Sequence, residues 1–470
     1  MFKAIFTNSF GILISRIFGF IRDLLTASVL GAGVYSDIFF IAFKLPNLFR
    51  RIFAEGAFTQ VFIPAFVRSA KKSVFSVHIF LLFLSIILTL TLIVNIAPAL
   101  ATKTIAVGFS DETISIASTF VAINFWYLPL IFSVTFLSTL LQYKHHFTTT
   151  AFSTALLNIS LISALLLAQN KTDEEIVYYL SFGVVVGGIL QLISHIVAIK
   201  KLGLCKTLYG GFKYLKIKSN LIKEDTKKFK KQFFPAMWGN STAQISAFLD
   251  TFLASFLVTG SISYLYYANR IFQLPLALFA IATSVALFPK VARYLKNSDE
   301  TKAKLYLAKA FWFLLFLLGA SSIGGTILSQ EITWLLFQRG AFTYEDTLNT
   351  SLILKMYLIG LIPYGLSKLF LLWLYAKEMQ MVAAKIATYS LVTYLIFALT
   401  LISTFGVAGI AFASTMSGFV NFAFVIKNFG LDNFKDILKD KKSIYFIVSM
   451  IVFVFILFAF KNIIDPYIFS

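Results

Sequence analysis

Charged side chains are concentrated in the first apolar stretch of this sequence. An ionised side chain inside a bilayer costs roughly 2.5–3.5 kcal/mol on insertion scales. Because eight such charges in two successive segments cannot all reach the headgroups, we expect the helices that carry them to line an aqueous cavity that is net positive. The eight charges are Arg16, Arg22, Asp23, Asp37, Lys44, Arg50, Arg51 and Glu55.

The second half of the chain has few charges within apolar runs, chiefly Asp250, Arg270 and Lys368. Across both halves the interior set has seven cations and four anions, so the predicted cavity attracts an anion. The planar guanidinium group of arginine suits phosphate oxygens, which it can bind with two parallel hydrogen bonds. The candidate binding residues are Arg16, Arg22, Arg50, Arg51, Arg270 and Lys368.

The spacing of these residues favours shared helix faces. Arg16, Gly19 and Asp23 recur at i, i+3 and i+7, and Arg22 flanks their face. Arg51 and Glu55 are four apart and can pair. One alternative is that such charges form internal salt bridges that pin helices, and another is that Lys44, Arg50 and Arg51 extend to the inner interface. For Arg16, Arg22 and Arg270 no local partner is evident, which favours binding.

Composition excludes several classes of protein. The net charge of +20 resides in loops between apolar spans, which favours anionic lipids at the inner face as a partner and disfavours nucleic acid. The single cysteine, Cys205, cannot form an intramolecular disulfide. His145 and His146 are adjacent and point to different helix faces, so we predict no metal site. No phosphate-binding loop, nucleophile elbow or zinc-protease motif is present, and we predict neither an enzyme nor a cofactor.

Apolar runs of about 20 residues, rather than alternating strands, predict an all-α polytopic membrane protein. Prolines within several runs, such as Pro46, Pro275 and Pro363, predict bent helices. Thirteen spans are predicted, near residues 4–30, 35–67, 75–100, 115–141, 150–169, 176–199, 232–258, 263–294, 305–329, 346–375, 382–403, 407–427 and 443–461.

The distribution of lysine and arginine over the loops sets the orientation. With the N-terminus in the cytoplasm, the lysines and arginines in loops on the inside outnumber those on the outside by roughly six to one. The first span contains charges and lacks a small-residue cleavage site, so we expect no cleaved signal peptide.

The polar segment 201–231 divides the chain nearly in half, and lysines interleaved with apolar residues favour an amphipathic helix on the inner leaflet over a solvated linker. The halves share short patterns, such as Asp23–Leu30 with Asp250–Leu257. We therefore predict two pseudo-symmetric six-helix lobes around a central cationic cavity, at 1–200 and 232–428, with an amphipathic segment and a thirteenth span at 429–470.

Several segments of the sequence resemble a known protein family. Arg16–Asp23, Gly31–Gly33, Ser36–Asp37, Ala42–Phe58 and Phe62–Pro64 are similar to the MurJ (MviN) family of lipid II flippases, within the superfamily of MATE exporters and polysaccharide flippases. The likeness continues at Gly260–Ser263, Tyr266–Ala268, Arg270, Leu274–Pro275, Leu336–Phe342 and Lys368, and so covers most of the chain.

The resemblance implies a cavity that opens alternately to either side of a bacterial inner membrane, with lipid II moving from the inner to the outer leaflet. It implies that Arg22 and Arg270 contact the pyrophosphate, and that supporting or gating residues hold arginines or form contacts that break during transport. Those residues are Asp23, Asp37, Lys44, Glu55 and Asn269.

Two features depart from the family pattern. Asn269 and Gln273 stand where some relatives have carboxylates, which makes the local site more positive. The family usually has fourteen spans, of which the last two form a groove for the lipid tail, whereas thirteen are predicted here.

Other interpretations stay open on the sequence alone. They are a flippase for another anionic polyprenyl-linked saccharide, a MATE-type drug exporter, an enzyme acting on polyprenyl phosphates, and a scaffold that recruits cell-wall synthesis proteins. The coupling ion, Na⁺ or H⁺, is also open, with Asp250 a candidate ligand.

Overall fold

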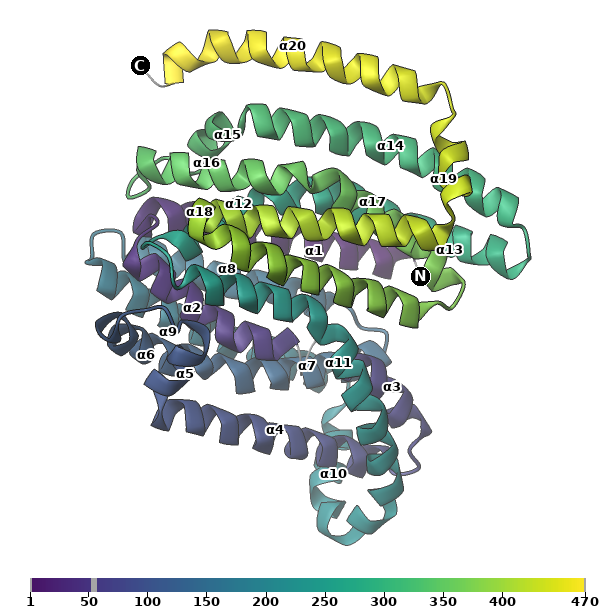
Figure 1. Cartoon of the computed structure of the whole chain (residues 1–470). Helices are drawn as coiled ribbons and strands as arrows, with labels where there is room; N and C mark the ends of the chain where they lie inside the picture. Colours follow the sequence, from purple (N-terminus) through teal and green to yellow (C-terminus); the bar gives the residue numbers. More distant parts are fainter. Residues whose placement is uncertain (1, 52–56, 469–470) are drawn as a thin grey trace. The chain divides into compact units, whose positions relative to one another are not determined.

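The computed structural model describes residues 2–51 and 57–468, which fold into helices joined by short turns (Figure 1). The chain forms two compact units, which divide after Gly260. Glu55 lies outside the described residues, and with it the predicted Arg51–Glu55 pair.

The first unit contains α1 (Phe2–Leu30), α2 (Val34–Phe49), α3 (Ala57–Arg68), α4 (Lys72–Ile96), α5 (Pro98–Ile105), α6 (Asp111–Phe125), α7 (Tyr127–Tyr143), α8 (Thr148–Leu167), α9 (Asp173–Lys201), α10 (Cys205–Lys218), η2 (Ser219–Ile222) and α11 (Lys223–Ala254).

The second unit begins at Ser261 and is helical as well. Its elements are α12 (Ser261–Pro275), the π-helical η3 (Leu276–Ile281), α13 (Ala282–Lys296), α14 (Glu300–Ile327), α15 (Ser329–Phe337), α16 (Tyr344–Ile359), α17 (Leu361–Ala376), α18 (Gln380–Phe429), α19 (Leu431–Leu438) and α20 (Lys442–Ile468).

Long apolar helices dominate both units. Among the described residues, eight helices are long and apolar enough to cross a membrane, and the pair α16 and α17, bent by 40°, raises the number to nine. The predicted spans 4–30, 35–67 and 232–258 are helical too, as α1, α2 with α3, and α11. These three segments are not among the helices counted above, and they carry most of the charges that lie within apolar runs. The all-helical, polytopic fold predicted from the sequence is confirmed.

Glycines end or interrupt helices where the sequence predicts it. Gly31, with φ of 65°, ends α1, and Pro46 lies inside α2. Gly406, with φ of 53° and ψ of −131°, interrupts α18, which is therefore two helices. That break matches the predicted boundary between spans 382–403 and 407–427, and it follows from the freedom of glycine at positive φ.

A cluster of phenylalanine rings holds α11 within the first unit. Phe58 of α3 stacks on Phe62 at 5.2 Å between ring centroids and meets the edge of Phe132 of α7 at 5.6 Å. Phe229 and Phe233 of α11 lie 6.1 Å and 6.5 Å from the Phe58 ring. Aromatic pairs in such tilted and edge-on arrangements add to ordinary apolar burial.

The segment 201–231, for which we predicted an amphipathic helix, is helical. It forms α10, η2 and the start of α11, and α10 packs against the start of α4 (Figure 1). A Cβ atom at Gly211 would lie 2.3 Å from the carbonyl oxygen of Ser73, so this approach requires glycine. The boundary that we predicted between 231 and 232 falls inside α11, while the duplication of two lobes stays a prediction.

Candidate functional site

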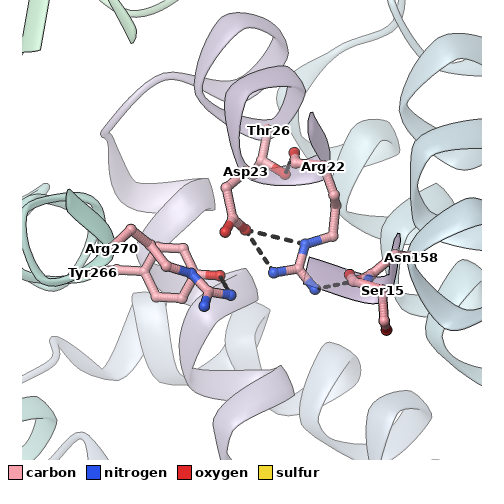
Figure 2. Close-up of polar contacts among 7 residues, drawn as sticks. All are labelled: Ser15, Arg22, Asp23, Thr26, Asn158, Tyr266 and Arg270. Carbon is pink, nitrogen blue, oxygen red and sulfur yellow. Dashed lines mark hydrogen bonds and ion pairs between the residues drawn. The ribbon is translucent and has the colours of Figure 1, made fainter. Parts of the chain in front are cut away.

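Arg22 is a buried guanidinium group on the first long helix. The helix α1 packs against α8, and Arg22 is only 7% exposed. Its Nε and Nη2 atoms donate to one carboxylate oxygen of Asp23, at 3.1 Å and 2.6 Å, and Nη1 donates to Oδ1 of Asn158 at 3.0 Å (Figure 2). We expected Arg22 to lack a local partner, and that expectation was wrong: the adjacent Asp23 forms an ion pair with it.

Arg16, one and a half turns earlier on the same helix, is exposed. Its neighbour Ser15 is buried, and the Ser15 carbonyl oxygen accepts a hydrogen bond from Nδ2 of Asn158 at 3.0 Å. The helix therefore presents two different environments to its two arginines. Arg22 is fixed by polar partners, whereas Arg16 is accessible.

One basic residue of α2 and one just after it meet polar side chains of α11. Lys44 donates through Nζ to the buried hydroxyl of Thr251, beside Asp250. Arg51 donates through Nη1 to Oε1 of Gln244 at 3.2 Å. Arg50, at the end of α2, is half-buried and continues the helical hydrogen bonds through its N–H. Each of these two hydrogen bonds joins segments of the first unit that are about 200 positions apart in the sequence.

Arg270 lies on α12 of the second unit. Its Nη2 donates to the Tyr266 hydroxyl at 3.1 Å, and its guanidinium carbon is 5.2 Å from the centre of the same ring (Figure 2). Tyr266 is one turn earlier, so the stacked geometry is local to the helix. The side chains of Asn269 and Gln273, the residues that depart from the family pattern, hydrogen-bond to each other.

Lys368 is accessible within an otherwise packed helix. Between Leu361 and Leu374 of α17, all of which the structure describes, it is the one exposed residue. Tyr364, Leu371 and Tyr375, at i−4, i+3 and i+7, are partly or fully exposed as well. Lys368 therefore lies on the accessible face of α17.

Sequence reasoning missed the uncharged partners. Asn158, Thr251 and Gln244 contact the predicted basic residues, yet none was singled out. A signal existed for Asn158, because an amide within the apolar run 150–169 is costly to bury without hydrogen bonds. No group of metal-ligating residues occurs among the described residues.

Comparison with known proteins gives a consistent result. The family model described as "Lipid II flippase MurJ" matches residues 26–467. A "Probable lipid II flippase MurJ" of Helicobacter pylori (strain J99) is 51% identical over 445 residues, which cover 93% of this chain and 97% of that protein. A protein of Aquifex aeolicus with the same description is 35% identical over 394 residues, 83% of this chain and 75% of that one.

Solved structures agree. The structure titled "Lipid II flippase MurJ, inward closed conformation" matches with a TM-score of 0.80 and 25% identity, over 98% of this chain and 99% of that chain. An inward-facing multidrug resistance MATE family transporter matches with a TM-score of 0.66 at 15% identity, over 93% of this chain and 99% of that chain, which shows a shared fold.

Proposed function

Because this chain belongs to the lipid II flippase MurJ family and is a lipid II flippase, we propose that its embedded basic residues bind the anionic headgroup of that substrate. The proposed binding residues are Arg16, Arg22, Arg50, Arg51, Arg270 and Lys368.

The accessibility of Lys368 is the observation that carries this proposal. An ammonium group on a membrane helix is stable only where water or an anion reaches it. Lys368 is exposed on α17, so an anionic headgroup that reaches this helix would meet an accessible ammonium group. A diphosphate is a suitable ligand for such a basic group, because its charge offsets the cost of desolvation.

Arginine supplies the geometry that a diphosphate needs. The forked guanidinium groups of Arg22 and Arg270 are both held by neighbouring polar groups in the structure, Arg22 by Asp23 and Asn158 and Arg270 by Tyr266. Groups held in place lose less entropy on binding than free ones. We assign Asp23, Asp37, Lys44, Glu55 and Asn269 supporting or gating roles, and Asp250 the role of candidate ion ligand.

The direction of transport follows from charge and orientation. With the N-terminus in the cytoplasm of a bacterial inner membrane, the anionic headgroup moves outward by alternating access, down an inside-negative potential. A full crossing of the membrane field gains about 2.3 kcal/mol per charge per 100 mV. In this proposal the potential drives the cycle without ATP hydrolysis, and no enzymatic step is proposed.

The test uses the full-length protein in liposomes that contain fluorescent lipid II, with the accessibility of the headgroup to an impermeant quencher as the readout. We expect Arg16→Ala and Lys368→Ala to slow flipping about tenfold or more. Lys309→Ala, which removes an exposed lysine of α14, is the matched control and should flip lipid II at the wild-type rate. If Arg16→Ala and Lys368→Ala both flip at that rate, the proposed binding residues are wrong.

A further inference from the structure

Asn158 of α8 bridges two points on α1 that lie on either side of Gly19. Its Nδ2 donates to the Ser15 carbonyl oxygen at 3.0 Å, and its Oδ1 accepts from Nη1 of Arg22 at 3.0 Å (Figure 2). Only 6% of the residue is exposed. Both functions of the amide, one donor and one acceptor, are therefore used in holding α1 at the level of its buried arginine.

Gly19 gives the amide its access to α1. Ser15, Gly19 and Arg22 recur at i, i+4 and i+7, so all three face α8. A Cβ atom at Gly19 would lie 3.3 Å from Nδ2 of Asn158, closer than such contacts usually are. A glycine at this turn thus lets the amide reach one turn back and one turn forward along the helix.

The Arg22 guanidinium group is held from two sides by acceptors of different charge. Asp23 accepts from Nε and Nη2 through a single oxygen, on one side of the guanidinium group. The hydrogen bond from Nη1 to Asn158 holds its other side. Because the amide is neutral, it fixes the arginine without cancelling more of its positive charge.

We infer that Asn158 is a positioning residue for lipid II transport, which orients Arg22 toward the diphosphate while leaving its charge available. The inference rests on the proposed role of Arg22 in binding the substrate. Residue 158 must therefore be a neutral acceptor. The acceptor orients Arg22, and a carboxylate in its place would weaken the binding of the diphosphate.

Two substitutions at residue 158 separate positioning from packing. Asn158→Leu keeps the branched shape of the side chain and removes the acceptor, and we expect lipid II affinity to fall about tenfold. Asn158→Asp keeps the shape and an acceptor but adds a second negative charge beside Arg22, and we expect a larger loss of affinity than for Asn158→Leu. A purely structural role predicts the opposite order, because aspartate is the closer mimic of asparagine.

Lipid II affinity, flipping rate and thermal unfolding midpoint are measured for each full-length variant in detergent and liposomes. Asn124→Leu is the matched control: Asn124 is a fully buried amide on α6, bonded to Ser181 at 2.8 Å. It should lower the unfolding midpoint and leave lipid II affinity unchanged. Gly19→Ala, which displaces the Asn158 amide without altering it, should reduce affinity in the same direction as Asn158→Leu and keeps the test usable if residue 158 variants fold poorly.

A double-mutant cycle with Arg22→Ala distinguishes the possible failures. If Asn158 acts through Arg22, Asn158→Leu has no further effect on affinity in the Arg22→Ala background. If Arg22→Ala alone leaves affinity unchanged, the proposed binding role of Arg22 is wrong. If Arg22→Ala weakens affinity but Asn158→Leu does not, or if the two losses add, only the inference about Asn158 is overturned.

Discussion

The Asp37 carboxylate accepts a hydrogen bond from the backbone N–H of Gly260, at 2.8 Å and across 223 positions of sequence. Both residues are buried. Gly260 has φ of 88°, a conformation that favours glycine, and it follows the C-terminal end of α11. The contact therefore ties the loop after α11 to the first turn of α2, and gives Asp37 a partner in the backbone that its sequence pattern did not suggest.

Removal of the Asp37 carboxylate should destabilise the first unit. Asp37→Ala leaves the buried N–H of Gly260 without this acceptor, which costs roughly 1–3 kcal/mol. Asp37→Asn keeps an oxygen acceptor and should lose less than half as much. The thermal unfolding midpoint in detergent, measured for both variants, checks the order, and equal losses would show that the charge rather than the hydrogen bond matters.

Tyr266 should support substrate binding through both its ring and its hydroxyl. Tyr266→Phe removes the acceptor for Nη2 of Arg270 but keeps the face over which the guanidinium group lies. We expect about a threefold loss of lipid II affinity for Tyr266→Phe and about tenfold for Tyr266→Leu, which loses both interactions. Binding titrations with purified lipid II measure the two values. Similar losses for the two variants would exclude a contribution from the ring.

Lys461 should anchor the C-terminal part of α20. Its Nζ contacts Glu331 of α15, which is buried, and lies 3.3 Å from Asp465 one turn away. Few other contacts bury α20, because only 6% of its most apolar stretch is buried. The helix runs beside α14 (Figure 1).

Lys461→Ala leaves the buried Glu331 carboxylate without its cation, and we expect a loss of roughly 3 kcal/mol in unfolding free energy. The control is Lys442→Ala at the other end of α20, where the ion pair with Asp440 at 3.5 Å is exposed and should contribute less than about 1 kcal/mol. Thermal unfolding of the two variants gives the comparison. A larger effect at Lys442 would contradict it.

Helices and their breaks could be predicted from the sequence because both depend on local chemistry. Apolar runs of membrane length define the spans, and glycines such as Gly31 and Gly406 end them at positive φ. The break inside α18 lies where the sequence placed it. The continuity of α11 through residue 232 could not be predicted in this way, because it depends on Phe229 and Phe233 packing against Phe58 of a distant helix.

The basic residues of the candidate site could be predicted, but their partners could not. A charge in an apolar run is visible in a single sequence, and Arg16, Arg22, Arg270 and Lys368 were found on that signal. Helical spacing argues against contacts between adjacent residues, so the Arg22–Asp23 pair was missed: the long arginine side chain folds back on its neighbour. Asn158 is 136 positions from Arg22, and only the packing of α8 on α1 brings them together.

The single cysteine provides a direct test of the predicted orientation. Cys205 is exposed at the start of α10, in the segment that the positive-inside pattern assigns to the cytoplasm. An impermeant maleimide should therefore label it in inverted membrane vesicles and not in spheroplasts. Asn170→Cys in a Cys205→Ser background, on the exposed turn between α8 and α9, is the matched control and should show the reverse pattern. Because the two sites lie at opposite ends of α9, labelling of both from one side would mean that this helix does not cross the membrane.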